Sequence, residues 1–264
     1  MESIKYCSFE EFSHPNFQQY IRFAAPKNRH PHHKYISLTM DDTISLPAQS
    51  SLTNSILTRH STRNFLPRSV PIEHLKESLS IAQHAPSNSN IQPWRAIFLS
   101  GNKLDTLKAA LLEAAQNGKP QIPPIPEDFR HYRSELGREL FGKAMGIARD
   151  DMPSRRAAEL RNFYFFGAPL VGIIYMDRSL SHADSLSVGM WLQTLILELT
   201  EKGLDTCVEG SVAGYPAVIR EELAITDGMD ILCGLAVGYG DPESRANQMV
   251  SQRDSWDTSI DFRP

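Results

Sequence analysis

Residues 59–65 read Arg-His-Ser-Thr-Arg-Asn-Phe, and residues 85–94 read Ala-Pro-Ser-Asn-Ser-Asn-Ile-Gln-Pro-Trp. These two polar stretches are the most distinctive part of the chain, and a helical pattern joins them. Pro71 suits the start of a helix, and apolar residues follow it at steps of three and four positions. The members of this predicted buried face are Ile72, Leu75, Leu79 and Ala82. We therefore expect two polar loops at opposite ends of one helix.

The first stretch has the side chains that bind a phosphate. It holds two arginines and two hydroxyl residues within five positions. Arginine binds phosphate oxygens in a bidentate manner, and a serine or threonine hydroxyl adds a short donor. The same composition is also typical of an ordinary solvated basic turn, so the residues alone leave both interpretations open.

The second stretch is a stiff loop rich in hydrogen-bonding groups. Two prolines bound a run of serine, asparagine and glutamine residues. Such a loop suits a flat heterocycle with several carbonyls and ring nitrogens, although it would equally form a hydrogen-bonded turn. For Trp94 itself we expect a place in the hydrophobic core.

The rest of the chain alternates helices with short apolar strands. The predicted strands are 96–99, 169–176, 204–208 and 231–237, and the further predicted helices are 104–114, 184–202 and one that Pro216 begins. Gly203 fits the C-terminal end of the longest helix. A proline-rich break at 120–126 precedes a charged, helix-favouring segment at 127–161. This order favours an α+β layered domain, and neither a GxGxxG turn after a strand nor a GxxxxGK[ST] loop occurs.

Composition excludes some classes of function. The 264 residues carry a formal net charge of -4, which argues against sequence-independent nucleic-acid binding. Cys7, Cys207 and Cys233 form no CxxC pair, so we expect reduced thiols. No apolar window reaches the length of a membrane helix or signal peptide, so we expect a cytoplasmic protein without membrane association. The histidine cluster at 30–33 lacks neighbouring Cys or carboxylate ligands, and we predict no metal site.

The two stretches, in this order around a helix, closely resemble the start of the FMN-dependent nitroreductase family. The resemblance continues through Phe166-Gly167-Ala168-Pro169, the helix at 186–203 and Cys207-Val208-Glu209-Gly210. It ends with Gly238-Tyr239-Gly240-Asp241-Pro242, Asn247 and Arg253, and covers roughly residues 52 to 256. It implies an N-terminal extension at 1–50, an FMN-binding domain at 51–264 and a C-terminal arm at 241–264.

The resemblance also implies a fold and a set of residue roles. The fold is a three-layer α+β arrangement, with a central, mostly antiparallel sheet flanked by helices in an intertwined homodimer. Arg59, Ser61 and Arg253 would bind the FMN phosphate, while His60 and Arg63 would contact the ribityl chain and the pyrimidine side. The loop residues Pro86, Ser87, Asn88 and Asn90 would reach the flavin of the partner subunit. Arg161 would lie near the pyrimidine edge.

The catalytic roles fall to the loop that faces the flavin. Val208, Glu209 and Gly210 lie in this loop, and backbone N–H groups of Glu209 and Gly210 would face flavin N5, the atom that exchanges hydride. Arg63 would stabilise the anionic reduced flavin. One departure concerns the phosphate, because many members carry a basic residue where this chain has Ser251.

The implied activity is a ping-pong reaction. NADH or NADPH would donate hydride to FMN, and a nitroarene, quinone or activated alkene would then be reduced. Two alternatives stay open: a flavin-dependent oxidase or dehydrogenase acting on a specialised small metabolite, and a non-catalytic flavin-binding protein. A soluble α+β binding domain without flavin is a third.

Overall fold

The computed structural model describes residues 51–263. The predicted extension at 1–50, with its histidine cluster and Cys7, lies outside the described residues. No helix among residues 51–263 combines the length and apolar character needed to cross a membrane.

A four-stranded antiparallel sheet forms the centre of the described domain. Its strand order is β1-β2-β4-β3, and every neighbouring pair is antiparallel. The strands are β1 (Arg95–Ser100), β2 (Leu170–Asp177), β3 (Asp205–Glu209) and β4 (Met229–Gly238). The four predicted strands and the antiparallel α+β fold are confirmed. One row across the sheet places Glu209 opposite Gly234, and Gly234 opposite Ile173.

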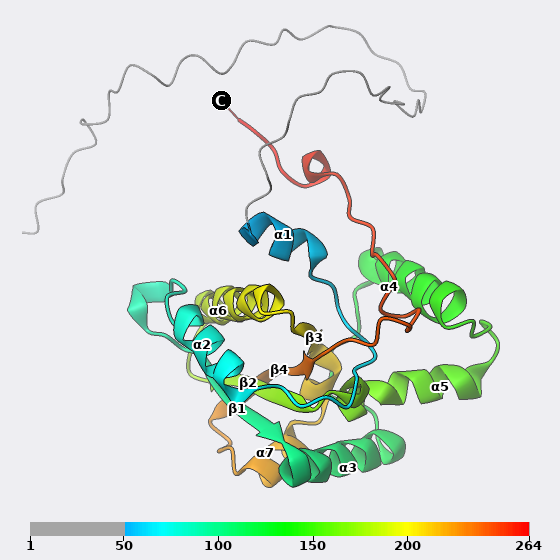
Figure 1. The fold of residues 1–264 in the computed structure, drawn as a ribbon, viewed down its shortest axis with the longest axis horizontal. Coiled ribbons are helices and arrows are strands. Elements are labelled where there is room, and N and C mark those ends of the chain that lie inside the picture. Colours follow the sequence, from blue (N-terminus) through cyan, green and yellow to red (C-terminus); the bar gives the residue numbers. More distant parts are fainter. Residues whose placement is uncertain (1–50, 264) are drawn as a thin grey trace, which may run out of the picture. The chain divides into compact units, whose positions relative to one another are not determined.

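Helices cover both faces of the sheet (Figure 1). One face packs against α2 (Ile72–Ala82) and α6 (His182–Glu201), and this core contains Trp94, as expected. The other face packs against α3 (Gly101–Asn117) and α7 (Pro216–Leu223). Burial of two apolar sheet faces by separate helix layers is what the continuous apolar character of β2 predicts.

Helix α6 is defined by its ends and by one apolar face. Ser181 and Asp184 form a capping box at its N-terminus, and Gly203 follows its end with a φ of +72°. The buried residues of its inner face include Trp191, Leu195, Ile196 and Leu199. The ring of Trp191 stacks on Trp94, with centroids 5.9 Å apart. This helix therefore fixes the loop that precedes Trp94.

One expectation about the helices was wrong, and the helix-favouring segment at 127–161 is helical but divided. Ile72 belongs to the predicted buried face of α2, yet it is 52% exposed, and Ser78 is buried on that helix instead. The charged segment at 127–161 does not form one continuous helix. It divides into short pieces: η2 (Glu127–Phe129), α4 (Arg130–Gly137), the π-helix η3 (Arg138–Ala144), α5 (Met152–Leu160) and the start of η4 (Arg161–Gly167). Gly146, with a φ of +69°, ends the first part, and Asp151 caps α5.

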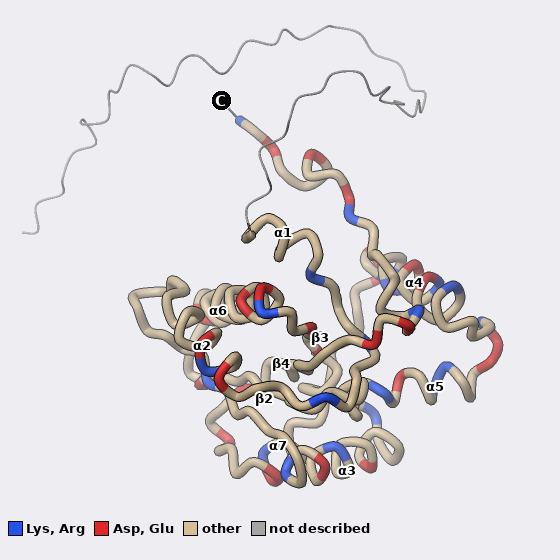
Figure 2. Tube along the Cα trace, in the orientation of Figure 1, with Lys and Arg blue, Asp and Glu red and all other residues tan. Residues whose placement is uncertain are grey.

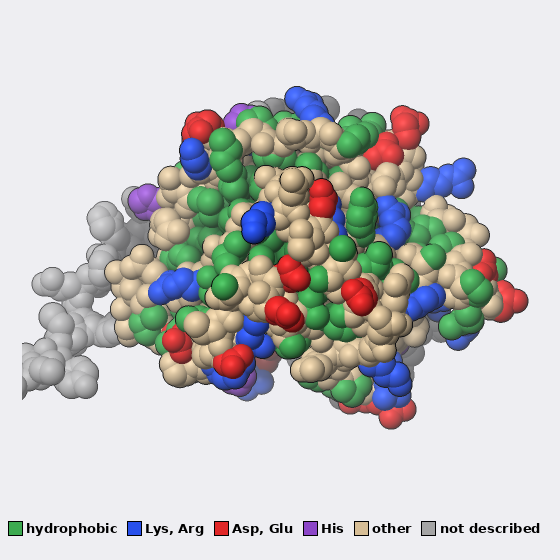
Figure 3. All heavy atoms as spheres, turned by 90° about the horizontal axis from the view of Figure 1, so that it is seen from below, with side chains coloured by type: hydrophobic (Ala, Val, Ile, Leu, Met, Phe, Trp, Pro, Cys, Tyr) green, Lys and Arg blue, Asp and Glu red, His purple; other side chains and the backbone are tan. Residues whose placement is uncertain are grey.

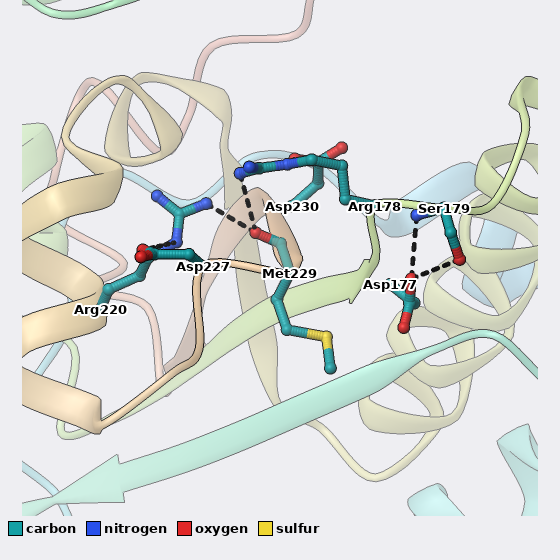
Figure 4. Close-up of polar contacts among 7 residues, drawn as sticks. All are labelled: Asp177, Arg178, Ser179, Arg220, Asp227, Met229 and Asp230. Carbon is teal, nitrogen blue, oxygen red and sulfur yellow. Dashed lines mark hydrogen bonds and ion pairs between the residues drawn. The ribbon is translucent and has the colours of Figure 1, made fainter.

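Polar contacts fasten the start of β4 to the neighbouring turns (Figure 4). Arg178 and Arg220 both donate to the backbone carbonyl of Met229, over 3.4 and 2.6 Å. Arg178 also pairs with Asp230 at 2.7 Å. The carboxylate of Asp177 accepts the backbone N–H and the hydroxyl of Ser179, and these bonds lower the pKa of Asp177. This end of the sheet is stabilised by contacts that involve none of the predicted site residues.

The surface shown in Figure 3 mixes charges of both signs with apolar patches. Lys and Arg side chains alternate with Asp and Glu side chains across this face. The face therefore shows no broad field of one sign, in line with the small net charge of -4.

Gly234 lies where the sheet leaves no room for a side chain. A Cβ atom at this position would lie 2.9 Å from a ring carbon of Phe165 and 3.4 Å from a methyl of Val212. We expect Gly234→Ala to lower the free energy of unfolding by about 1–3 kcal/mol, because an overpacked core must shift its backbone. Urea unfolding measures the change. Gly142→Ala is the control, since its Cβ would meet nothing within 4 Å; equal effects of the two variants would refute the steric explanation.

Candidate functional site

The segment 59–65 runs beside the edge strand β3. The backbone N–H of Thr62 donates to the carbonyl of Thr206 at 3.0 Å, and Ser61 forms a parallel bridge with Thr206. Further on, the N–H of Phe65 donates to Phe166 at 3.2 Å, and Phe65 itself is buried. The first polar stretch is therefore held in an extended conformation against the strand that ends at Glu209.

This arrangement brings the predicted cationic residues close to the end of β3. The pKa of Cys207 is raised to about 12, first by burial and then by Glu209, while Arg63, Ser61 and Arg59 act in the opposite direction. Glu209 is 2% exposed, and neither of its carboxylate oxygens has a hydrogen-bond partner. Burial raises the pKa of Glu209 well above 4.5, opposed only in part by Arg63. The five residues thus form one electrostatic cluster.

The end of β3 also presents an accessible edge. Side chains alternate along a strand, and here Cys207 and Glu209 are buried while Val208 is 43% exposed and Gly210 is exposed. The short helix η5 (Gly210–Gly214) begins immediately afterwards. A flat ligand lying against this edge would meet the predicted residues Val208, Glu209 and Gly210 through their backbone.

Three residues that received no individual role from the sequence position the first stretch. The side-chain oxygen of Asn247 accepts the N–H of Arg63 at 2.8 Å, and its amide donates to the carbonyls of Asn64 and Asp241. Asn64 in turn donates to Asp241 at 2.8 Å and accepts from Arg161 at 2.7 Å. The predicted residue Arg161 is thereby brought to the segment, half-buried, and burial lowers its pKa.

His60 makes only local contacts. Its Nδ1 lies 3.2 Å from the carbonyl of Thr58, and its Nε2 lies 3.4 Å from the hydroxyl of Thr62. These contacts orient the ring along the segment. Its predicted contact with the ribityl chain stays a prediction.

The second polar stretch is tied to the N-terminus of α6. The backbone N–H of Asn88 donates to Ser187 at 3.1 Å, and the Asn88 amide donates to Asp184 at 3.2 Å. The carboxylate of Asp184 is buried and also accepts both donors of Ser181, and these bonds lower its pKa. Asp184 and Ser187 are positioning residues that the sequence did not single out.

This loop has an unusual backbone. Ser89, Asn90 and Gln92 adopt φ values of 48°, 56° and 53°. Within residues 51–263, no hydrogen bond or ion pair joins the loop to the segment 59–65. Pro86, Ser87, Asn88 and Asn90 are thus arranged together, but apart from the cationic residues of the same chain. Left-handed backbone held by surrounding contacts is typical of ligand-binding segments.

The structure leaves Arg253 away from the other predicted phosphate ligands. Its guanidinium donates to the carbonyls of Ser251 and Gln252 within its own arm. The neighbouring Asp254 accepts from Tyr132 of α4 at 2.8 Å. No hydrogen bond in the described chain joins Arg253 to Arg59 or Ser61, so its role in phosphate binding stays a prediction.

Comparison with known proteins identifies the family. The sequence pattern described as "Nitroreductase family" matches residues 56–239. The chain is 34% identical over 215 residues to the chloronitrobenzene nitroreductase of Comamonas testosteroni, covering 79% of this chain and 95% of that protein. It is 36% identical over 205 residues to the 4-nitrobenzoate reductase of Pseudomonas putida, covering 75% and 89%.

A solved structure shows the same fold. The crystal structure of the FMN- and NADPH-dependent nitroreductase from Sphigopyxis sp. strain HMH matches with a TM-score of 0.77 and 31% identity, over 81% of this chain and 99% of that one. With this likeness, the three-layer fold expected from the sequence is confirmed. The chain belongs to the nitroreductase family.

Proposed function

We propose that the chain is an FMN-dependent oxidoreductase that uses NADH or NADPH to reduce a small organic acceptor. A nitroarene, a quinone or an activated alkene would serve as that acceptor. The observation that carries this proposal is the cluster of Arg59, Ser61 and Arg63 beside the accessible end of β3. The names of the relatives support it, because they are nitroreductases and the Sphigopyxis protein is FMN- and NADPH-dependent.

The residues of the cluster fit FMN chemically. A guanidinium and a hydroxyl are suitable donors for a phosphate, and Arg59 and Ser61 would bind it. The exposed edge at Val208 and Gly210 offers a backbone surface for a flat ring, and the buried side chain of Glu209 leaves that surface free. When bound, FMN would accept hydride from the nicotinamide and pass electrons to the acceptor.

The protein's contribution is position and charge. Arg63 and Arg161 would hold positive charge near the pyrimidine side, where it stabilises developing negative charge in a site of low dielectric constant. Asn64 accepts from the guanidinium of Arg161, Asn247 accepts from the backbone N–H of Arg63, and the guanidinium of Arg63 donates to the carbonyl of Ser61. Backbone N–H groups at Glu209 and Gly210 would donate toward the reacting edge of the ring.

We further propose that two subunits build each site. The loop with Pro86, Ser87, Asn88 and Asn90 has the polar groups to complete a flavin site, but its hydrogen bonds attach it to α6 and not to the cationic segment. A homodimer that places this loop over the partner's β3 would bring the two halves together. The exposed apolar residues of α1 (Ser51–Thr58), Leu52, Ile56 and Leu57, are suited to burial in such an interface.

An absorption spectrum of the purified protein, followed by anaerobic addition of NADH and then NADPH, tests this function. We expect a flavin spectrum that bleaches with at least one nucleotide and recovers when 4-nitrobenzoate or a quinone is added. A flavin spectrum that neither nucleotide bleaches would favour the oxidase or the non-catalytic alternative. Absence of flavin binding, even after reconstitution with FMN, would overturn the proposal.

A further inference from the structure

A cavity of about 770 Å³ lies beside the candidate site. Its lining comes from the proline-rich segment 120–124, from α4 and η3, from α5 and from the start of η5. This size falls in the range of about 300–1,000 Å³ that is usual for small-molecule sites. The cavity therefore has room for a substrate with one or two rings.

The charges that line the cavity are strongly unbalanced. Five arginines line it, namely Arg133, Arg138, Arg149, Arg155 and Arg156, and Glu159 is the one carboxylate among the lining residues. Figure 2 shows the basic residues along α4 and α5. Only Arg156 forms an ion pair within the described chain, with Glu159 at 3.8 Å. Four guanidiniums thus lack a carboxylate partner there.

Unpaired guanidiniums gathered around one cavity favour an anion inside it. Four of these arginines are exposed and Arg155 is half-buried, so solvent screens part of their mutual repulsion, and a bound ligand that excludes water would strengthen their attraction for an anion. The planar guanidinium donates two parallel hydrogen bonds to a carboxylate or a phosphate. The charge of the lining therefore selects for the sign of the ligand.

Most of the other lining residues are apolar or aromatic. Leu140, Phe141, Phe163 and Tyr215 line the cavity, and the rings of Phe163 and Tyr215 meet edge to face at 5.1 Å. Aromatic side chains pack well against another ring. Apolar walls combined with guanidiniums fit a ligand that is an aromatic ring with an anionic substituent.

The cavity adjoins the end of β3. Ser211 lines it and directly follows Gly210, and the Ser211 hydroxyl is buried without a hydrogen-bond partner. The proline-rich wall is attached to the same turn, because the N–H of Gln121 donates to Gly214 at 2.7 Å. A ligand in this cavity would lie next to the strand end where we place the flavin.

We propose that this cavity binds the acceptor substrate and selects one with an anionic group, such as a carboxylate, on an aromatic ring. That the ligand is the acceptor rests on the proposed function, whereas the anion selectivity follows from the cavity alone. The phosphates of NADPH carry the same kind of charge, so the kinetic test below separates the acceptor from the nucleotide.

Calorimetry with two unreactive probes tests the selectivity without turnover. Benzoate and benzamide have nearly the same shape and differ in charge. We expect the FMN-loaded protein to bind benzoate at least about tenfold more tightly, since charge-assisted hydrogen bonds exceed neutral ones. The triple variant Arg133→Gln, Arg138→Gln and Arg149→Gln should lose this preference. Lys143→Gln is the control, because Lys143 belongs to η3 but does not line the cavity and pairs with Glu139.

Each outcome bears on one of the two proposals. Equal binding of the two probes would overturn the anion selectivity, and a benzoate preference that survives unchanged in the triple variant would overturn the role of Arg133, Arg138 and Arg149 in it. Benzoate binding by a protein that takes up no FMN would support the selectivity and overturn the proposed function. Circular dichroism and flavin content of each variant establish that it is folded.

Steady-state kinetics separates the acceptor from the nucleotide. In the triple variant, kcat/KM for 4-nitrobenzoate should fall at least about tenfold relative to that for 4-nitrobenzamide, while KM for NADPH stays unchanged. A rise in KM for NADPH but not for NADH, with the ratio of the two nitro compounds unchanged, would assign the cavity to the nucleotide phosphate and overturn the acceptor proposal.

Discussion

Arg59→Ala should weaken FMN binding about 10- to 150-fold, which corresponds to the roughly 1.5–3 kcal/mol of a hydrogen bond to a charged group. The physical reason is that Arg59 supplies both charge and donors beside Ser61, at a position where β3 holds the backbone through Thr62. A fluorescence titration of the apoprotein with FMN measures the dissociation constant. The flavin content of the purified variant should fall in parallel.

Arg68→Ala is the matched control for this variant. Arg68 lies in the same part of the chain, but its guanidinium stacks over the ring of Tyr239 at 3.9 Å. Arg68→Ala removes the same charge without changing the cluster at the end of β3. Equal loss of FMN from both variants would show that only net charge matters and would contradict the role of Arg59.

Arg59→Ala also tests whether two subunits build each site. In a twofold dimer of Arg59→Ala with Asn90→Gly, one site carries both substitutions and the other carries neither. Glycine is used at position 90 because the φ of 56° there strains alanine. Random exchange of the two variants should restore FMN to about one quarter of all sites. No restoration, with heterodimers shown to form, would refute a site built from two subunits.

The regular elements of the fold could be predicted because local signals agreed with the tertiary structure. Helix α6 has its apolar face and the glycine that follows its C-terminal end in the sequence, and the structure places both as expected. Strands β1, β2 and β4 each contain a short apolar run, in keeping with the helices that cover both faces of the sheet. The two polar stretches were recognisable because they stand in a characteristic order around one helix, although the composition of each alone is compatible with an ordinary turn.

The helix-favouring composition of the segment 127–161 indicated helices but not where they break, which Gly146 and the cap at Asp151 decide. Other features of the site depend on contacts between distant residues. The network of Asn64, Asp241 and Asn247 joins positions more than 170 residues apart, and periodicity contains no information about such pairs. Likewise, nothing in a single sequence shows that Glu209 faces inward without a partner.

Glu209→Gln should change how stability depends on pH. Burial raises the pKa of the folded carboxyl above 4.5, so the folded protein keeps its proton while the unfolded chain loses it. The contribution of the Glu209 carboxyl to the free energy of unfolding is therefore fully present below pH 4.5, and it is lost as the pH rises toward the pKa in the folded protein. Across that window the wild-type protein should lose about 1.4 kcal/mol per pH unit relative to the variant.

Urea unfolding at several pH values between about 5 and 8, at fixed protein and FMN concentrations, measures this difference. The two proteins are compared by the slope of the free energy of unfolding against pH. Their absolute stabilities are not compared, because the glutamine amide adds buried donors of its own. Glu221→Gln on the exposed side of α7 is the control and should follow the wild-type slope. Parallel curves for wild type and Glu209→Gln would mean that the carboxylate is ionised in the folded protein. Arg63 would then compensate its charge fully, and the positive field that we assign to Arg63 at the flavin would be correspondingly weaker.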